Sequence, residues 1–146
     1  MRKLIGSLLA LVALTLSGCG YNKFQSTEEQ VKGETRVSLA LHPDLAPYKV
    51  AVLPLLKKRP EIVELCHRIK DDLKRDVMAV YDDTAAIGKL YRRQDEIGTP
   101  WCVTVDVDSL EDGAVTIRDR DSMTQERVAV DQVKQVILGR LAAVRP

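Results

Sequence analysis

Apolar and polar residues recur along this chain with two different periods, which indicates a mixture of strands and helices. Lys49–Leu55 is a short apolar run rich in valine, and it predicts a buried strand. Arg59–Asp76 follows with helical spacing, and Pro60 is acceptable in the first turn of a helix. The residues expected on the buried face of that helix are Ile62, Leu65, Cys66, Ile69 and Leu73.

The same alternation of strand and helix patterns is repeated further along the chain. Val77–Asp83 predicts a second strand, and Thr84 is expected to cap a second helix. That helix carries apolar side chains at helical spacing and stops at Gly98–Pro100, a glycine followed closely by a proline. Its apolar positions are Ile87, Leu90, Tyr91 and Ile97.

Trp101–Val107 predicts a third strand with two different faces. Trp101, Val103, Val105 and Val107 share one face, and Cys102, Thr104 and Asp106 share the other. A turn at Asp112-Gly113 leads into two further strands, Ala114–Asp121 and Gln125–Val130. The last helix is expected to begin near Asp131, with Val133, Val136, Ile137 and Leu141 on its apolar face.

The predicted fold class is therefore α/β, with elements in the order β-α-β-α-β-β-β-α. The first three strands are joined by helices and are expected to be parallel, while the hairpin adds antiparallel strands at one edge. The prediction is one domain over residues 36–146, with a mixed five-stranded sheet and about three helices.

A positively charged start and a short apolar run, Leu4–Leu16, open the chain and predict a signal peptide over residues 1–18. The tetrad Leu16–Cys19 resembles the bacterial lipobox, in which the cysteine thiol is acylated. This resemblance implies that Cys19 is lipidated and anchors the protein in a membrane if the leader is processed; otherwise the protein is expected in the cytoplasm. An ordinary secretory signal with an incidental cysteine is the alternative.

Residues 19–35 are polar and have no apolar stripe, which predicts a tether. The stretch GCGYNKFQSTEEQVKG resembles the start of LemA-family proteins. The resemblance covers Leu16 to about Gly33 and implies nothing for the rest of the chain. Prolines at 43, 47, 54 and 60 exclude the long helices expected of LemA.

Composition limits the functions that the whole chain can have. Its 45% hydrophobic and 29% charged residues are ordinary for a soluble domain, and the formal charge is only +1. Loss of Arg2 and Lys3 with a leader would lower this charge to −1. A polyanionic partner must therefore be bound by a local patch of charge.

Candidate metal and catalytic residues are few. With Cys19 acylated, two cysteines and two histidines remain, and no cofactor or metal site is expected. Cys66 and Cys102 are interpreted as buried free thiols, with a disulfide between them as the alternative. The Asp-x-Asp pairs at 106/108 and 119/121 have no phosphate-binding glycine loop beside them, and no Ser-His-Asp pattern is present.

Two segments combine arginine with carboxylates. Lys89, Arg92 and Arg93 lie close together on the second predicted helix, and Arg118 and Arg120 alternate with aspartates in the later hairpin. Arginine binds phosphates and base edges with two parallel hydrogen bonds, and a carboxylate accepts from the amino group of cytosine. Mixed charges suit the reading of bases; solvated surface pairs are the alternative.

Three long blocks of this sequence resemble the C-terminal anticodon-binding domain of glycyl-tRNA synthetase, of the homodimeric class II type. They are LALHPDLAPYKVAVLPLLKK, YDDTAAIGKLYRRQDEIGTPWCVTVD and LEDGAVTIRDRDSMTQERVAVDQV. The resemblance runs from about Val37 to Leu141. It implies a mixed five-stranded sheet with three helices, shared with the histidyl, prolyl and threonyl enzymes, and binding of the anticodon stem-loop of glycine tRNA.

The resemblance also implies a set of tRNA-binding residues beside one edge of the sheet. They are Arg92, Arg93, Asp95 and Glu96, with Arg118, Asp119 and Arg120 opposite. The class II catalytic motifs are absent from this sequence, so the chain is not expected to be an enzyme on its own. Its expected partners are glycine tRNA, a separate synthetase catalytic chain and, through acylated Cys19, a membrane.

Three functions are consistent with these observations. The first is a tRNA-binding module, or an accessory subunit of the kind that a similar domain forms in a mitochondrial DNA polymerase. The second is a membrane-tethered lipoprotein that uses the same fold for an unknown ligand, because fold does not determine function. The third is a spliced or fragmentary reading frame with no selected function.

Overall fold

The computed structural model describes residues 37–144. The predicted signal peptide, Cys19 and the LemA-like tether fall outside the described residues. The elements are β1 (Val50–Pro54), α3 (Pro60–Leu73), β2 (Ala79–Tyr81), α4 (Ile87–Ile97), β3 (Trp101–Val105), α5 (Asp108–Asp112), β4 (Ala114–Asp119), β5 (Gln125–Ala129), a 3-10 turn at Val130–Gln132, and α6 (Val133–Val144).

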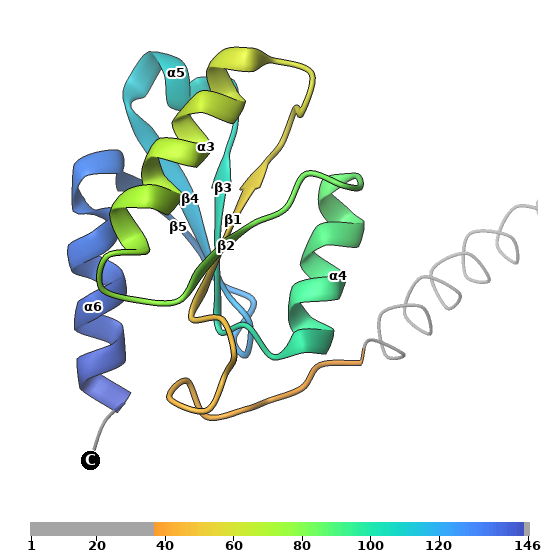
Figure 1. The fold of residues 1–146 in the computed structure, drawn as a ribbon, viewed down its shortest axis with the longest axis vertical. Helices are drawn as coiled ribbons and strands as arrows, with labels where there is room; N and C mark the ends of the chain where they lie inside the picture. The colour runs from red at the N-terminus through yellow and green to blue at the C-terminus, as the bar shows by residue number, and fades with distance from the viewer. Residues whose placement is uncertain (1–36, 145–146) are drawn as a thin grey trace, which may run out of the picture. The chain divides into compact units, whose positions relative to one another are not determined.

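The five strands form one mixed sheet in the order β2-β1-β3-β4-β5 (Figure 1). Strand β1 pairs in parallel with β2 and β3, and the β4–β5 hairpin is antiparallel and lies at one edge. This topology confirms the predicted fold class, including the parallel first three strands. A crossover helix joins each consecutive pair of those three, as parallel neighbours require.

Helices α3 and α6 cover one face of the sheet, and α4 lies against the other (Figure 1). The larger core lies beneath α3 and α6 and contains the predicted apolar face of α3. Burial of these side chains away from water is the main favourable term in folding. The core residues on α3 are Ile62, Leu65, Cys66, Ile69 and Leu73, and those on α6 are Val133, Ile137 and Leu141.

A smaller core lies between α4 and the opposite face of the sheet. It contains Ala51, Leu53, Leu90 and Cys102. Cys66 belongs to the larger core and Cys102 to the smaller one, so the two cysteines lie on opposite faces of the sheet and form no disulfide with each other. The interpretation as buried thiols is confirmed, and the alternative of a disulfide between them is wrong. Burial also raises the pKa of the Cys66 thiol to about 12, which keeps it protonated at neutral pH.

One local prediction is wrong, and one short helix was not predicted. Ala86, not Thr84, precedes the first turn of α4, and the Thr84 hydroxyl bonds to the carboxylate of Asp82 instead. The five-residue helix α5 was not expected, because it is too short for an apolar stripe. It forms where the Asp106 carboxylate accepts from the amide and hydroxyl of Ser109, which closes a turn directly after β3.

The segment Val37–Lys49 crosses the carboxyl end of α4 before it enters β1. The amide of Leu39 donates to the carbonyl of Asp95 at 2.8 Å, and the carbonyl of Leu41 accepts from Arg120 at 3.0 Å. Within residues 37–144, no helix is long and apolar enough to cross a bilayer.

Candidate nucleic-acid interface

The side of strands β3, β4 and β5 that faces the same way as α4 carries polar side chains. Cys102 packs toward α4, and its partners across the sheet are Arg118 on β4 and then Gln125 on β5. Directly opposed residues point to the same face of a sheet, so both share this side. The next row is Thr104, Thr116 and Arg127. We refer to Thr104, Thr116, Arg118, Gln125 and Arg127 as the polar face.

Arg118 occupies the centre of this polar face. Its two terminal nitrogens donate to the two carboxylate oxygens of Asp95 at 3.2 and 3.5 Å, and one of them also contacts the sulfur of Met123. The side chains of Arg118 and Asp95 are 5% and 1% exposed. A buried charge requires such a partner, so α4 and β4 are joined at this point by a desolvated ion pair.

Tyr91 links this pair to strand β3. The guanidinium carbon of Arg118 lies 4.8 Å from the centre of the Tyr91 ring, within the range of a cation–π contact. The Tyr91 hydroxyl shares a hydrogen bond with the hydroxyl of Thr104. Burial raises the pKa of Tyr91, so the phenol keeps its proton. Ring, carboxylate and sulfur together fix the orientation of the Arg118 guanidinium.

Arg120 is buried at the turn of the same hairpin, and its side chain forms hydrogen bonds with the backbone of other segments. Its guanidinium donates to the carbonyls of Gly98 at 2.7 Å and Leu41 at 3.0 Å, and its remaining contacts go to the carboxylate of Asp121. These bonds tie the end of α4 to the segment that precedes β1.

Asp119 organises the turn between β4 and β5. Its carboxylate accepts from the amides of Asp121 and Ser122 and from the indole nitrogen of Trp101. Burial opposes ionisation of Asp119, but these hydrogen bonds outweigh it and hold the pKa below its usual range. The turn ends near Met123, whose φ of 60° is rare for a residue with a side chain.

The exposed surface of α4 carries other predicted residues. Arg92 and Glu96 lie one turn apart and are exposed, and within residues 37–144 the side chain of neither forms a hydrogen bond or an ion pair. Arg93 lies on the other flank of α4, where it pairs with Asp82 at 2.5 Å and with Thr84. The structure therefore joins Asp95 to Arg118 and leaves Arg93 apart from them.

Arg127 lies at the end of the polar face that is near the carboxyl end of β3. Its guanidinium donates to the carboxylates of Asp106 and Asp112 and to the hydroxyl of Thr116. The hydrogen bond from Arg127, with those from Ser109, lowers the pKa of Asp106 to about 2 against the penalty of its partial burial. These contacts hold the start and end of α5 to the hairpin.

The sequence analysis did not identify five residues of this region: Tyr91, Thr104, Thr116, Gln125 and Arg127. The alternation within each strand was a usable signal, because it assigned Cys102 and Thr104 to one face. The sequence does not show the register of the sheet, that is, which residues of neighbouring strands lie opposite each other. Only the pairing of Cys102 with Arg118 and of Thr104 with Thr116 shows which side chains are neighbours.

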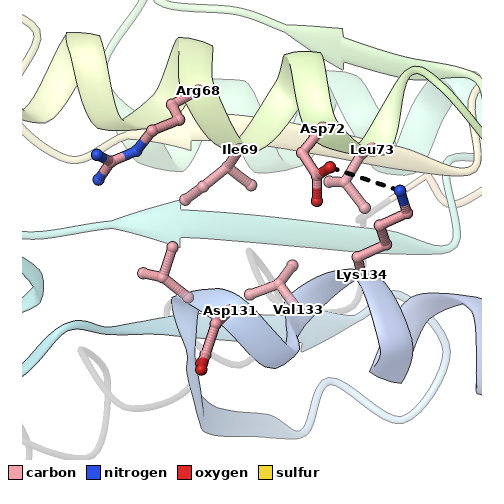
Figure 2. A pocket seen from close by; sticks show the side chains of 8 residues that line it. Arg68, Ile69, Asp72, Leu73, Asp131, Val133 and Lys134 are labelled. Carbon is pink, nitrogen blue, oxygen red and sulfur yellow. Dashed lines mark hydrogen bonds and ion pairs between the residues drawn. The ribbon is translucent and has the colours of Figure 1, made fainter.

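The opposite side of the sheet has a cavity of about 180 Å³ between α3 and α6 (Figure 2). Lys134 reaches across it and pairs with Asp72 at 3.5 Å and with Asp76 at 2.6 Å. The apolar side chains of Ile69, Leu73 and Val133 form much of the remaining lining. Within the described chain, no group of three His, Cys, Asp or Glu side chains is placed to hold a metal ion.

Comparison with known proteins identifies the family to which this geometry belongs. Residues 49–140 match the family model described as the anticodon binding domain. This chain belongs to the anticodon-binding domain family. The match extends from Lys49, directly before β1, into α6, so it includes every strand of the sheet and the whole polar face.

Curated relatives of this anticodon-binding domain are glycine–tRNA ligases. The ligase of Caldanaerobacter subterraneus subsp. tengcongensis is 55% identical over 114 residues, which is 78% of this chain and 24% of that protein. That of Borreliella afzelii is 52% identical over 112 residues, 77% of this chain and 25% of the relative. That of Geobacillus kaustophilus is 50% identical over 115 residues, which is 79% of this chain and 24% of that protein. The chain thus spans about a quarter of the length of these relatives.

Proposed function

We propose that this anticodon-binding domain binds the anticodon stem-loop of glycine tRNA. The observation that carries the proposal is the identity of 50% or more with glycine–tRNA ligases, which extends over the domain. Recognition of RNA sequence depends on unpaired loop bases, which stack on flat side chains and expose their hydrogen-bonding edges. The polar face supplies suitable groups beside an exposed helix surface.

Within this function, Arg118 is the central group of the proposed site. Its guanidinium lies over the ring of Tyr91 and is bound by Asp95, so it is held in a fixed orientation at the centre of the polar face. Arg92 and Glu96 are exposed on α4 and are proposed to contact the RNA directly. Arg93, Asp119 and Arg120 complete the proposed set by holding the β2–α4 loop, the hairpin turn and the end of α4.

Binding of the 146-residue chain to glycine tRNA and to a transcript with a changed anticodon tests this function. Tighter binding to the glycine transcript across a salt series is the expected result. Glu96→Ala is expected to weaken binding of the glycine transcript, while Glu64→Ala, a matched loss of an exposed carboxylate on α3, leaves it unchanged. Equal affinity of the wild-type chain for the two transcripts would contradict the proposal.

In this proposal the domain acts as a binding module and performs no chemistry itself. A separate synthetase catalytic chain is the partner that would make binding productive. Addition of the chain to such a catalytic chain that lacks its own anticodon-binding domain is expected to raise charging of glycine tRNA. No change in the rate of charging would remove this partner from the proposal.

A second candidate function is supported by the tetrad Leu16–Cys19, which resembles a lipobox. In this proposal Cys19 is acylated and the anticodon-binding fold is held at a membrane for interaction with another ligand. Labelling with a radioactive fatty acid and fractionation of cells test it, with Cys19→Ser as the control. Soluble, unlabelled protein that also binds no RNA would instead agree with a spliced or fragmentary reading frame.

A further inference from the structure

The cations of this domain divide into paired and unpaired groups. Arg93, Arg118, Arg120, Arg127 and Arg140 all bond to carboxylates. Within residues 37–144, the loop between β1 and α3 has the longest run of cations without such a partner. Lys57, Lys58 and Arg59 are consecutive and exposed, and the side chain of none of them forms an ion pair within this part of the chain.

The position of this loop relates it to the polar face. The amide of Leu55 donates to the carbonyl of Val105 at 2.9 Å, so the loop leaves the sheet beside the end of β3. The residue directly after that strand is Asp106, whose carboxylate binds Arg127 of the polar face. Ligands of open α/β sheets bind outside the carboxyl ends of the parallel strands, which is the edge that the loop borders.

We propose that the loop Leu55–Arg59 binds the phosphate backbone of the RNA whose bases contact the polar face. Lysine suits this task because its ammonium group is a point charge that attracts phosphate without a fixed geometry. The chain has a formal charge of only +1, so attraction of RNA must come from local runs of cations. Unpaired cations lose no existing partner when they meet a phosphate, unlike Arg118 or Arg127.

This assignment rests on the proposed binding of tRNA, and it gives the polar face and the loop different roles in that binding. Base contacts at the polar face discriminate between anticodons, whereas phosphate contacts at the loop act on every RNA alike. Leu55 and Leu56 in the same loop are 42% and 44% exposed, so an anionic membrane is the competing partner that the experiment must separate.

The test compares two double variants of the full chain that remove the same charge. K57A/K58A changes the loop, and K74A/R75A removes two exposed cations just beyond the last residue of α3. That helix has 14 residues, so the two sites are about 20 Å apart along it. Binding of glycine tRNA and of the anticodon-changed transcript is measured for each variant from low to moderate salt.

For K57A/K58A, we expect the slope of log affinity against log salt to become shallower by about 0.7 to 0.9 for each lost phosphate contact. Both transcripts should weaken by the same factor, and K74A/R75A should keep the wild-type slope. An unchanged slope for K57A/K58A overturns the proposal, as does an equal change in both variants, which would reflect net charge alone.

Two further outcomes separate this proposal from the others. If the wild-type chain does not distinguish the two transcripts but K57A/K58A still flattens the slope, the anticodon function fails and the loop is retained as a phosphate-binding surface. Sedimentation with vesicles containing phosphatidylserine tests the membrane. Vesicle binding that K57A/K58A abolishes, with the RNA slope unchanged, overturns the assignment to RNA.

Discussion

The guanidinium carbon of Arg118 lies 4.8 Å from the centre of the Tyr91 ring, so a strand and a helix are joined through a cation and an aromatic face. Asp95, one turn beyond Tyr91 on α4, binds the same guanidinium through both carboxylate oxygens. Helix α4 thereby fixes the orientation of the Arg118 guanidinium. This arrangement relates local structure to the proposed recognition of RNA.

Replacement of Tyr91 by alanine is expected to weaken binding of glycine tRNA by about two- to thirtyfold, because a cation–π contact contributes about 0.5 to 2 kcal/mol. Tyr91→Phe keeps the ring and loses only the hydrogen bond to Thr104, so it should retain most of the affinity. Titration of both variants with labelled tRNA measures this difference. Equal losses in the two variants would show that the hydroxyl, not the ring, is the important group.

Replacement of Asp95 by asparagine is expected to lower the free energy of unfolding by about 3 kcal/mol, because it leaves Arg118 as a buried charge without a counter-ion. Both partners are almost fully buried, so solvent screens their interaction little. Urea denaturation followed by circular dichroism measures the change. Asp71→Asn is the control, since that carboxylate is 65% exposed and its partner Lys70 also reaches solvent, so loss of this surface pair should change the free energy of unfolding much less.

The fold was predictable from the sequence because its periodic patterns are long and unambiguous. Every buried apolar residue of α3 was assigned from spacing alone, and glycine followed by proline marked the end of α4 correctly. Helix α5 was not predicted because five residues are too few to show the helical spacing of apolar side chains. Thr84 was misassigned because a threonine serves equally well in a turn, where it bonds to Asp82.

The candidate site was predictable only in part, for a different physical reason. Asp95 was selected through the resemblance to the synthetase domain and Arg118 also for its charge, but neither signal reveals which carboxylate meets which guanidinium. The contact spans 23 residues and depends on the register between β3 and β4. Arg120 was selected in the same way, and its backbone contacts to Gly98 and Leu41 have no signature in the sequence.

Replacement of Gly98 by alanine is expected to destabilise the domain by about 2 kcal/mol. Its φ of 90° disfavours any residue with a side chain, and an added Cβ would lie 3.0 Å from the carbonyl oxygen of Leu39. Gly139→Ala is the matched control, because a Cβ at that position of α6 meets no atom within 4 Å. It should stabilise the domain by about 0.5 to 1 kcal/mol in the same thermal or urea unfolding experiment.

The stability of the domain is expected to depend on pH through Asp106. The hydrogen bond from Arg127 is the largest cause that lowers the pKa of Asp106 from 3.8 to about 2, and the carboxylate also accepts from the amide and hydroxyl of Ser109. A depressed carboxyl pKa contributes stability above the pKa of the unfolded chain, and this contribution is lost as the pH falls through the folded value. Because the Arg127 side chain is 34% exposed, solvent screens this pair, and the contribution at neutral pH is about 1 kcal/mol.

Asp106→Asn should therefore be less stable than the wild-type chain at pH 7 by about this amount, and the difference should shrink between pH 4 and pH 2. Urea unfolding of both proteins at a series of pH values measures the difference in their free energies of unfolding. Groups that titrate in the same way in both proteins do not contribute to this difference. Glu111→Gln provides the control, because that exposed side chain on α5 makes no described ion pair. A stability difference for Asp106→Asn that stays constant from pH 7 to pH 2 would mean that the Arg127 contact does not depend on the charge of Asp106.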